Sequence, residues 1–269
     1  MKSKVSKRLL FELYCKIISI IVGIESFVFI FVDIPNDYKW IAALISAAIF
    51  IIAFIAVLIY ANNQNSVVVD LCCANLTVKF GDLFSEDGNK VISCNEYFDS
   101  IVDEKLISSK TLHGQVMNKY ITDIKDFDKK IIADNGCINS IVGINKNKHD
   151  GKQTQYKLGT CFKFDQFIFV AFSKFDSQYQ AYLDLPDYLF CLANFWTELN
   201  RVYNGENIVV PLMGSGLTRL ANNSLSKQQQ LQLLIDSLKY SNLSFAYDSH
   251  ITIVLSKELK DKIKLFNIE

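Results

Sequence analysis

Residues 208–219 combine the residue types that a phosphate-binding loop needs. Their sequence, IVVPLMGSGLTR, is a short apolar run followed by a Gly-Ser-Gly loop at residues 214–216, and then by the hydroxyl of Thr218 and the cation of Arg219. Glycines allow the backbone to approach a ligand closely and to turn successive N–H groups toward one anion. Glycine pairs also form ordinary turns, and Arg219 equally suits a solvated surface. The segment therefore predicts an anion loop but leaves both simpler alternatives open.

Histidine and cysteine are not spaced as metal ligands or as a catalytic pair. The three histidines, His113, His149 and His250, are far apart in the sequence, and no two cysteines have CxxC spacing. The cysteines are Cys15, Cys72, Cys73, Cys94, Cys137, Cys161 and Cys191. We interpret them as small buried apolar residues of a protein in a reducing compartment. The sequence therefore predicts neither a metal centre nor a catalytic residue.

The elements that must position the glycine loop are strands and helices in alternation. Apolar runs predict the strands, and a 3.6-residue periodicity predicts the helices. The predicted strands are residues 76–80, 90–95, 156–164, 167–172, 207–212 and 250–255, and the predicted helices are residues 114–134, 186–203, 227–240 and 258–266. This alternation is typical of a three-layer α/β/α domain, in which ligands bind beyond the carboxyl ends of the strands.

The N-terminal part of the chain has a different composition. The 269 residues are 50% hydrophobic, and their 28 Lys+Arg balance 28 Asp+Glu, which excludes the strongly basic character of proteins that bind nucleic acid. Residues 40–60 carry no charge and form a helix of roughly 31 Å, enough to cross a bilayer. A helix at about residues 13–34 contains Glu25 near mid-span, either as a pore or oligomer contact or as a tolerated polar group. We therefore predict a two-helix transmembrane hairpin at residues 1–62 and an α/β domain at residues 66–269.

The charges around the hairpin predict its orientation. Lysine and arginine occupy positions 2, 4, 7 and 8 before the first helix, whereas the turn after it carries Asp33 and Asp37 with only Lys39. By the positive-inside rule, we expect a multi-pass protein of the cell inner membrane with its N-terminus and its α/β domain in the cytoplasm. A cleaved signal peptide is the competing interpretation, but no small-residue cleavage site follows the first apolar run.

Several motifs, taken in order, resemble those of macro domains, the fold that binds ADP-ribose and related nucleotides. The matching segments are residues 78–84 (VKFGDLF), 91–95 (VISCN) and 211–216 (PLMGSG), which resemble the first strand, the next strand and the phosphate loop. Residues 96–99 and 107–115 depart from the common Asn-Ala-Ala-Asn pattern. Together with Tyr156–Thr160, they are similar instead to the branch found in Thoeris anti-phage defence effectors, in which a macro domain is fused to transmembrane helices.

The resemblance implies a ligand site built from several stretches of the chain. Asp82 is expected to accept the adenine amino group, although it could instead cap the following turn. Asn95 is expected near the distal ribose or, alternatively, only as a turn former. The implied ligand-binding residues are Asp82, Leu83, Asn95, Glu96, Phe98, Asp99, Ser109, Thr111, Leu112, His113, Gly114, Gly159, Thr160, Pro211, Leu212, Met213, Gly214, Ser215, Gly216, Leu217, Thr218 and Arg219.

The distal end of the ligand has two groups of candidates among these residues. A loop from Ser109 to Gly114 would cover it, with His113 either bonded to the ligand or only structural. Glu96 and Asp99 would meet the variable part of the ligand, or would be solvated charges at a strand end.

The resemblance also implies a non-catalytic receptor. A separate TIR-domain enzyme would convert NAD into an ADP-ribose-derived messenger, such as histidine-conjugated ADP-ribose, and the macro domain would bind it without any cofactor. Self-association would then disrupt the lipid membrane and kill the infected cell by abortive infection. Two alternatives remain open: a membrane-tethered ADP-ribosyl hydrolase in which Asp99 or His113 activates water, and a membrane protein that binds another anionic metabolite. No nucleic-acid partner is expected.

Overall fold

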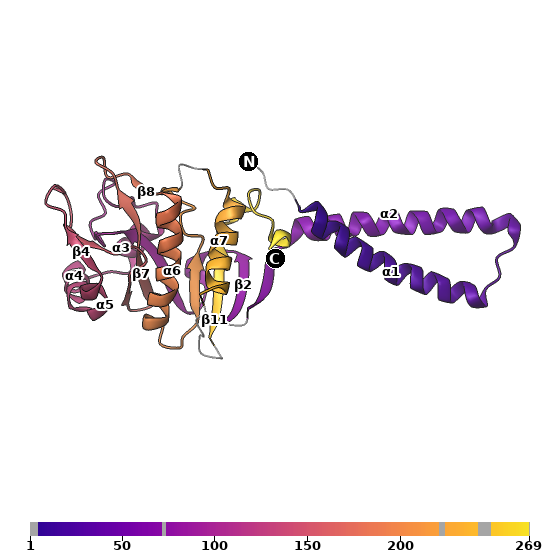
Figure 1. The fold of residues 1–269 in the computed structure, drawn as a ribbon, viewed down its shortest axis with the longest axis horizontal. Helices are drawn as coiled ribbons and strands as arrows, with labels where there is room; N and C mark the ends of the chain where they lie inside the picture. The colour runs from indigo at the N-terminus through magenta and orange to yellow at the C-terminus, as the bar shows by residue number, and fades with distance from the viewer. Residues whose placement is uncertain (1–4, 72–73, 221–223, 242–248, 269) are drawn as a thin grey trace. The chain divides into compact units, whose positions relative to one another are not determined.

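The chain folds into two compact units. The computed structural model describes residues 5–71, 74–220, 224–241 and 249–268. One unit consists of residues 68–262, and the other consists of residues 2–67 with residues 263–269. Figure 1 labels the seven α-helices of the described residues and several of the strands.

The smaller unit contains two long apolar helices, α1 (Lys7–Phe31) and α2 (Lys39–Asn63). Tyr14 connects them, because its hydroxyl donates to the Phe50 carbonyl at 3.2 Å and its ring meets the Phe54 ring edge-on at 5.3 Å. Among the described residues, these two helices have the length and the apolar composition of membrane spans. The two predicted apolar helices are therefore confirmed.

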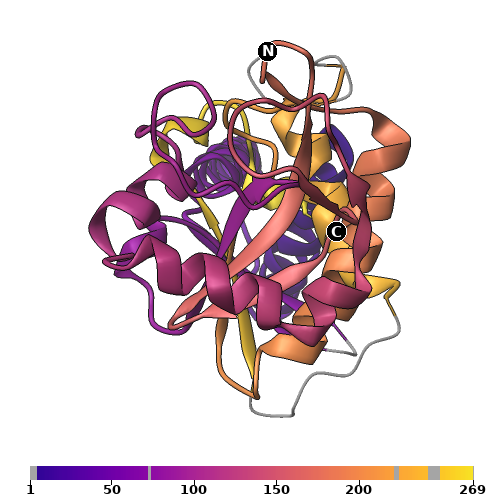
Figure 2. The same ribbon diagram turned by 90° about the vertical axis from the view of Figure 1, so that its left-hand side faces the viewer.

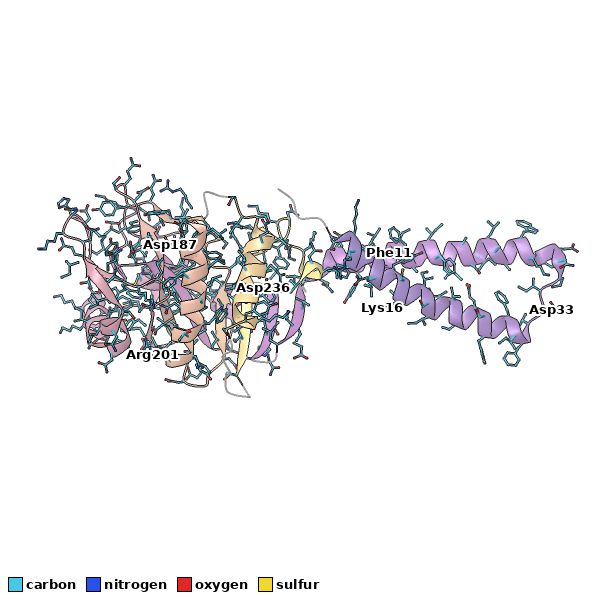
Figure 3. All side chains as sticks on the ribbon, viewed as in Figure 1. Phe11, Lys16, Asp33, Asp187, Arg201 and Asp236 are labelled. Atoms are coloured by element: carbon cyan, nitrogen blue, oxygen red, sulfur yellow. The ribbon has the colours of Figure 1, made fainter. Side chains whose placement is uncertain are left out.

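The first helix starts earlier than the sequence predicts. It begins at Lys7 rather than near residue 13, and an Arg8–Glu12 ion pair with i, i+4 spacing and a 3.0 Å separation supports this extra turn. Lys16 lies on α1 and Asp33 lies in the turn between the helices (Figure 3). That turn continues into a 3₁₀ helix, η1 (Asn36–Tyr38).

The larger unit is built on one mixed sheet. Within the described residues, its order is β1-β2-β11-β9-β3-β7-β8-β10, with β6 paired to β7 as a ninth strand. The strands are β1 (Ser66–Leu71), β2 (Ala74–Phe80), β3 (Asn89–Asn95), β6 (Cys161–Phe164), β7 (Phe167–Phe175), β8 (Ala181–Leu183), β9 (Ile208–Pro211), β10 (Arg219–Leu220) and β11 (His250–Leu255). The neighbours β2, β11, β9, β3 and β7 are parallel, whereas β6 and β8 run antiparallel to β7. Five strands therefore end at the same edge of the sheet.

Helices cover both faces of this sheet, as the alternating side chains of β7 show. Phe169 meets Phe127 edge-on at 4.9 Å on one face, and Phe172 meets Tyr188 edge-on at 6.0 Å on the other. The helices are α3 (Leu112–Lys119), α4 (Ile124–Ala133) and α5 (Asn135–Asn139) on the Phe127 side, and α6 (Leu185–Val202) and α7 (Lys227–Lys239) on the Tyr188 side. Figure 2 shows the sheet between these layers, so the predicted three-layer α/β/α domain is confirmed.

Local signals in the sequence determine where α6 and α7 begin. The Asp184 side chain accepts a hydrogen bond from the Asp187 amide, and Pro186 occupies the first turn of α6. Ser226 and Gln229 form a reciprocal capping box at the start of α7. Figure 3 shows Asp187 near the start of α6 and Arg201 near its end.

Three further predicted elements differ from the structure. The strand predicted at residues 156–164 is interrupted at Gly159, which has a φ of +85° and leaves no room for a side chain, because the Cys191 carbonyl oxygen lies 2.6 Å from its Cβ position. The helix predicted at residues 114–134 is two helices, because Asp123 caps a new start by accepting from the amides of Lys125 and Asp126.

The prediction of a C-terminal helix at residues 258–266 is also wrong. The segment forms two 3₁₀ turns, η4 (Lys257–Leu259) and η5 (Leu265–Asn267). In addition, β5 (Thr154–Tyr156) belongs to a separate two-stranded sheet with β4 (Ile141–Ile144), an element that the sequence analysis does not predict.

Most described cysteines are core residues. Cys94, Cys137, Cys161 and Cys191 are buried and free, and burial raises the pKa of each thiol. The interpretation of these four as small apolar residues is confirmed. Cys15 is exposed on α1, and Cys72 and Cys73 lie outside the described residues.

Candidate ligand-binding site

A cavity of about 1180 Å³ lies at the carboxyl ends of the parallel strands. Its lining residues come from the carboxyl ends of five strands and the segments after them: most of them lie within residues 81–84 for β2, 104–113 for β3, 173–181 for β7, 211–219 for β9 and 254–259 for β11. The volume exceeds the roughly 300–1,000 Å³ that is typical of small-molecule sites. This is the place at which an open α/β sheet is expected to bind a ligand.

The loop after β9 begins with a buried turn. Leu212 and Met213 are buried, and the Ser215 amide donates to the Leu212 carbonyl at 3.1 Å. Gly214 has a φ of +78°, and its Cβ position lies 3.1 Å from the Leu220 Cδ2 atom. A side chain at position 214 would therefore be strained, which accounts for the first glycine of the loop.

The second half of the same loop offers backbone donors to the cavity. Gly216 lines the cavity and has no atom within 4 Å of its Cβ position. Within the described residues, the amides of residues 216–218 donate no hydrogen bond to the protein. Leu217 and Thr218 also line the cavity, as do Pro211, Leu212, Met213, Gly214 and Ser215. The structure thus brings the predicted glycine loop to the cavity with unused N–H groups.

Arg219 lines the cavity but has an acidic partner. Its Nη2 atom donates to Asp176 Oδ2, and the same carboxylate accepts from the amides of Gln178 and Gln180 at 2.8 and 2.9 Å. These amide bonds, Gln180 first, and the guanidinium together lower the pKa of Asp176. The pair links the end of the glycine loop to the wall of residues 173–181.

Asp82 lies at the other end of the cavity and caps a turn. Its Oδ1 atom accepts from the Phe84 amide at 3.3 Å at the start of the 3₁₀ helix η2 (Leu83–Ser85). The side chain is exposed and lines the cavity, and it makes no other hydrogen bond within the described residues. Leu83 is buried beneath it and also lines the cavity. Capping therefore leaves Asp82 Oδ2 available to a ligand.

The start of α3 forms the part of the cavity wall that lies in the segment after β3. The Thr111 hydroxyl accepts from the Gly114 amide at 3.0 Å and donates to the Ser108 carbonyl at 2.7 Å. The Cβ position of Gly114 lies only 2.2 Å from the Ser108 carbonyl oxygen, so glycine lets this loop close against the helix. Thr111, Leu112 and His113 line the cavity, whereas Gly114 and the exposed Ser109 do not.

His113 is buried in this wall with a neutral imidazole. Its side chain is 5% exposed, and its ring meets Phe169 edge-on at 6.0 Å. Burial, followed by the nearby charge of Lys152, lowers the pKa of His113 to about 3. Among the described residues, its Nε2 atom has no hydrogen-bond partner.

The structure places four of the predicted site residues, at the end of β3 and just after it, outside the lining of this cavity. Asn95 Oδ1 accepts from the amides of Tyr97 and Asp99 at 3.0 and 3.3 Å, so Asn95 is a turn former. Glu96 accepts from Gln155 Nε2 at 2.8 Å, and burial raises the pKa of this carboxyl. Phe98 is fully buried, and Asp99 is paired with a lysine. Asn95, Glu96, Phe98 and Asp99 do not line the cavity.

Gly159 and Thr160 also lie outside the cavity lining. The Gly159 amide donates to the Ala171 carbonyl at 2.7 Å, and the Thr160 hydroxyl donates to the Lys157 carbonyl at 2.7 Å. Both residues therefore serve the tight connection between β5 and β6, where α6 packs against the backbone.

Two walls of the cavity were not predicted from the sequence. One wall consists of Val254 near the end of β11 and of residues 256–259 after it, and the other consists of Phe175 at the end of β7 and of residues 178–181 after it. The signal was present, because both segments follow predicted strands and the carboxyl ends of parallel strands share one edge. Charges in the lining nearly balance: Lys105, Lys110, Arg219 and Lys257 accompany Asp82, Glu104 and Glu258.

Comparison with known proteins identifies the class of the larger unit. The family model described as "Thoeris protein ThsA, Macro domain" matches residues 76–256, which extend from β2 to β11. The unit is therefore a macro domain. Thoeris protein ThsA of Bacillus amyloliquefaciens (strain Y2) is 32% identical over 243 residues, which cover 89% of this chain and 82% of that protein. The chain belongs to the ThsA family of Thoeris macro-domain proteins.

Solved macro domains are more distant in sequence. The Oceanobacillus iheyensis macrodomain with MES bound and the same macrodomain with ADP each have a TM-score of 0.47 and 12% identity to this chain. Each comparison covers 72% of this chain and 90% of the solved chain.

Proposed function

We propose that the cavity binds an ADP-ribose-derived messenger and that the protein is a receptor rather than an enzyme. The observation that carries this proposal is the loop at residues 214–218, which lies at the wall of a large cavity and whose amides at positions 216–218 donate no hydrogen bond to the described part of the chain. Successive unpaired N–H groups suit a diphosphate, because they provide donors without requiring a basic protein. The ThsA family assignment agrees with this ligand class.

The two ends of the cavity suit the two ends of such a ligand. Asp82, beyond β2, has a carboxylate oxygen available to an adenine amino group. Thr111 and His113 lie in the wall beyond β3, on the other side of the glycine loop in the strand order. A dinucleotide-like molecule would therefore lie across the strand ends, with its diphosphate at residues 214–218.

The apolar helices suggest how binding would be converted into an effect. In the proposed mechanism, a partner TIR-domain enzyme makes the messenger from NAD, and the messenger favours an assembled state of the membrane hairpins in the cell inner membrane. A ligand shifts such an equilibrium only if it binds the assembled state more tightly. Assembly would then disrupt the lipid bilayer and kill the infected cell.

A titration of the full chain in detergent or lipid discs tests the ligand class. ADP-ribose, histidine-conjugated ADP-ribose and NAD are titrated in turn while heat and product are followed together. Gly216→Glu should abolish binding, since the new carboxylate would enter the open space beside the diphosphate. Gly143→Glu is the matched control, because Gly143 also has no atom within 4 Å of its Cβ position but does not line the cavity.

Three outcomes separate the candidate functions. Binding without turnover supports the receptor, whereas turnover of any of the three nucleotides supports the alternative of a membrane-tethered ADP-ribosyl hydrolase. Absence of binding by the wild-type chain would reject both. Membrane permeability in cells that express the full chain with a TIR partner then tests the effector mechanism, which fails if Gly216→Glu is as toxic as the wild type.

A further inference from the structure

The side chain of Lys227 contacts the glycine loop from outside the cavity. Lys227 is the first residue of α7, and its Nζ atom donates to the Gly214 carbonyl at 3.3 Å and to Gln230 Oε1 at 3.2 Å. The side chain is half-buried and does not line the cavity, although Gly214 does. Lys227 therefore touches the backbone of the loop without facing the space that a ligand would occupy.

This contact holds the second end of one peptide group in the loop. The Gly214 carbonyl and the Ser215 N–H belong to the same trans peptide, so they point in opposite directions. The Ser215 amide donates to the Leu212 carbonyl at 3.1 Å, whereas the Gly214 carbonyl accepts from Lys227. Because both ends are bonded, this peptide has a fixed orientation where the chain enters residues 216–218.

The helix that carries Lys227 is firmly placed. Ser226 and Gln229 close its first turn with a capping box, and Trp196 Nε1 of α6 donates to Ser237 Oγ at 2.8 Å. Figure 1 shows α7 beside α6. The ammonium group is therefore held next to the loop by a packed helix and by its own two hydrogen bonds.

The charge of Lys227 has no carboxylate partner among the described residues. Both of its hydrogen-bond acceptors, the Gly214 carbonyl and Gln230 Oε1, are neutral. Burial, followed by the nearby charge of Lys262, lowers the pKa of Lys227. The cation is thus disfavoured in the ligand-free chain, and an anion at residues 214–218 would supply the missing opposite charge.

We propose that Lys227 is a positioning residue of the ligand site, which fixes the Gly214–Ser215 peptide and attracts the diphosphate through the loop. Its positive charge adds to the amide donors of residues 216–218 without making the surface of the cavity basic. The inference rests on the proposed function, because it takes an anionic ligand at the glycine loop. It adds a residue that no ligand would touch.

Two substitutions of Lys227 in the full chain, in detergent or lipid discs, test this role. ADP-ribose and inorganic pyrophosphate are titrated into each variant. Lys227→Met keeps the length of the side chain but removes its charge and its donors, and should weaken the binding of both anions at least about tenfold. Lys227→Arg keeps the charge and the donors, and should restore the affinity to within about threefold of the wild type.

Denaturant unfolding of the ligand-free chain separates this role from a merely structural one. Because Lys227 is disfavoured as a cation without the ligand, Lys227→Met should leave the unfolding midpoint unchanged or raise it. A residue that only held the fold together would instead lower the midpoint and the affinity together. That combined loss would overturn the proposal.

Lys90→Met is the matched control. Lys90 is 6% exposed, and its Nζ atom also donates to a backbone carbonyl and a glutamine oxygen, those of Gly88 at 3.0 Å and Gln166 at 3.4 Å. It lies near the amino end of β3, whereas the cavity lies at the carboxyl ends of the strands. Its removal should leave the affinity for both anions unchanged.

The remaining outcomes distinguish this inference from the ligand proposal. Wild-type affinity in Lys227→Met, an equal loss in Lys90→Met, or no recovery in Lys227→Arg would overturn the role of Lys227 alone. Binding of pyrophosphate but not of ADP-ribose by the wild type, with pyrophosphate weakened in Lys227→Met, would support Lys227 and reject ADP-ribose as the ligand. A wild type that binds neither anion would overturn both proposals.

Discussion

Asp99 and Lys148 form an ion pair in the interior of the macro domain. The Lys148 Nζ atom lies 3.0 Å from both carboxylate oxygens, and the two side chains are 0% and 3% exposed. Asp99 Oδ1 also accepts from the Lys152 amide at 2.7 Å, yet burial outweighs these contacts and raises the pKa of the carboxyl. The pair anchors the segment after β3 and occupies an aspartate that the sequence analysis assigns to the ligand.

Removal of one partner should therefore destabilise the domain rather than weaken ligand binding directly. Lys148→Met leaves a buried carboxylate without its cation, which we expect to lower the free energy of unfolding by roughly 3–5 kcal/mol. Denaturant unfolding of the full chain measures the change. Lys105→Met is the matched control, because the Lys105–Asp150 pair is about half exposed and should contribute no more than about 1 kcal/mol. Equal losses in the two variants would contradict the prediction.

Asp99 illustrates why part of the site was not predictable from the sequence. The glycine loop and Asp82 were found because strand ends and turn residues are local signals. The partner of Asp99 lies 49 residues further along the chain, and no pattern connects the two positions before the chain is folded. The same reason applies to Gly159, whose neighbour is the backbone of α6.

Helices and strands of the macro domain also differ in whether local or distant residues determine them. The helices predicted at residues 186–203 and 227–240 match α6 and α7, whose starts are set by local caps at Asp184 and Ser226. By contrast, β8 and β10 have only three and two residues, and their pairing depends on the return of distant segments to the end of the sheet. Such short strands carry too few residues to show a period of two.

His113 should make stability depend on pH. The pKa of His113 is about 3 in the folded protein, against the ordinary value of 6.5 expected in the unfolded chain. Between pH 6.5 and pH 3, the unfolded chain therefore binds a proton that the folded chain does not bind. Stability from the neutral imidazole is thus complete above pH 6.5 and is lost as pH falls toward 3. Between pH 6.5 and pH 5 the loss should be about 1.6 kcal/mol.

The test compares the pH dependence of unfolding in two variants. His113→Gln should flatten the curve between pH 6.5 and pH 5, because glutamine does not titrate. His149→Gln removes an exposed histidine and should leave the slope of the wild type. If His113→Gln retains the full slope, another group causes the pH dependence.

Gly114→Ala tests the close contact between α3 and the preceding loop. Alanine favours a helix by up to about 1 kcal/mol over glycine, but the new methyl group would lie 2.2 Å from the Ser108 carbonyl oxygen. The atoms on both sides of this contact belong to the backbone, so neither the helix nor the loop can easily move away. We therefore expect a net loss of about 1–3 kcal/mol in the free energy of unfolding, and weaker ADP-ribose binding. Thermal unfolding and titration measure these effects. Gly143→Ala, where no atom lies within 4 Å, should change neither, and a stabilised Gly114→Ala variant would show that the loop can move away.

Arg219 tests whether electrostatic attraction adds to the backbone donors of the glycine loop. Its ion pair with Asp176 is partly exposed, so Arg219→Gln should change the free energy of unfolding by less than about 1 kcal/mol. Because Arg219 lines the cavity beside residues 214–218, a diphosphate would compete with Asp176 for the guanidinium. We therefore expect Arg219→Gln to weaken ADP-ribose binding about fivefold to tenfold at low salt, and less at high ionic strength.

Lys239→Gln is the control for this prediction. It removes an exposed cation of α7 that does not line the cavity, and should leave the affinity for ADP-ribose unchanged at both salt concentrations. Equal affinity of the wild type and Arg219→Gln at low salt would mean that Asp176 retains the guanidinium in the complex, so that binding depends on the amides alone.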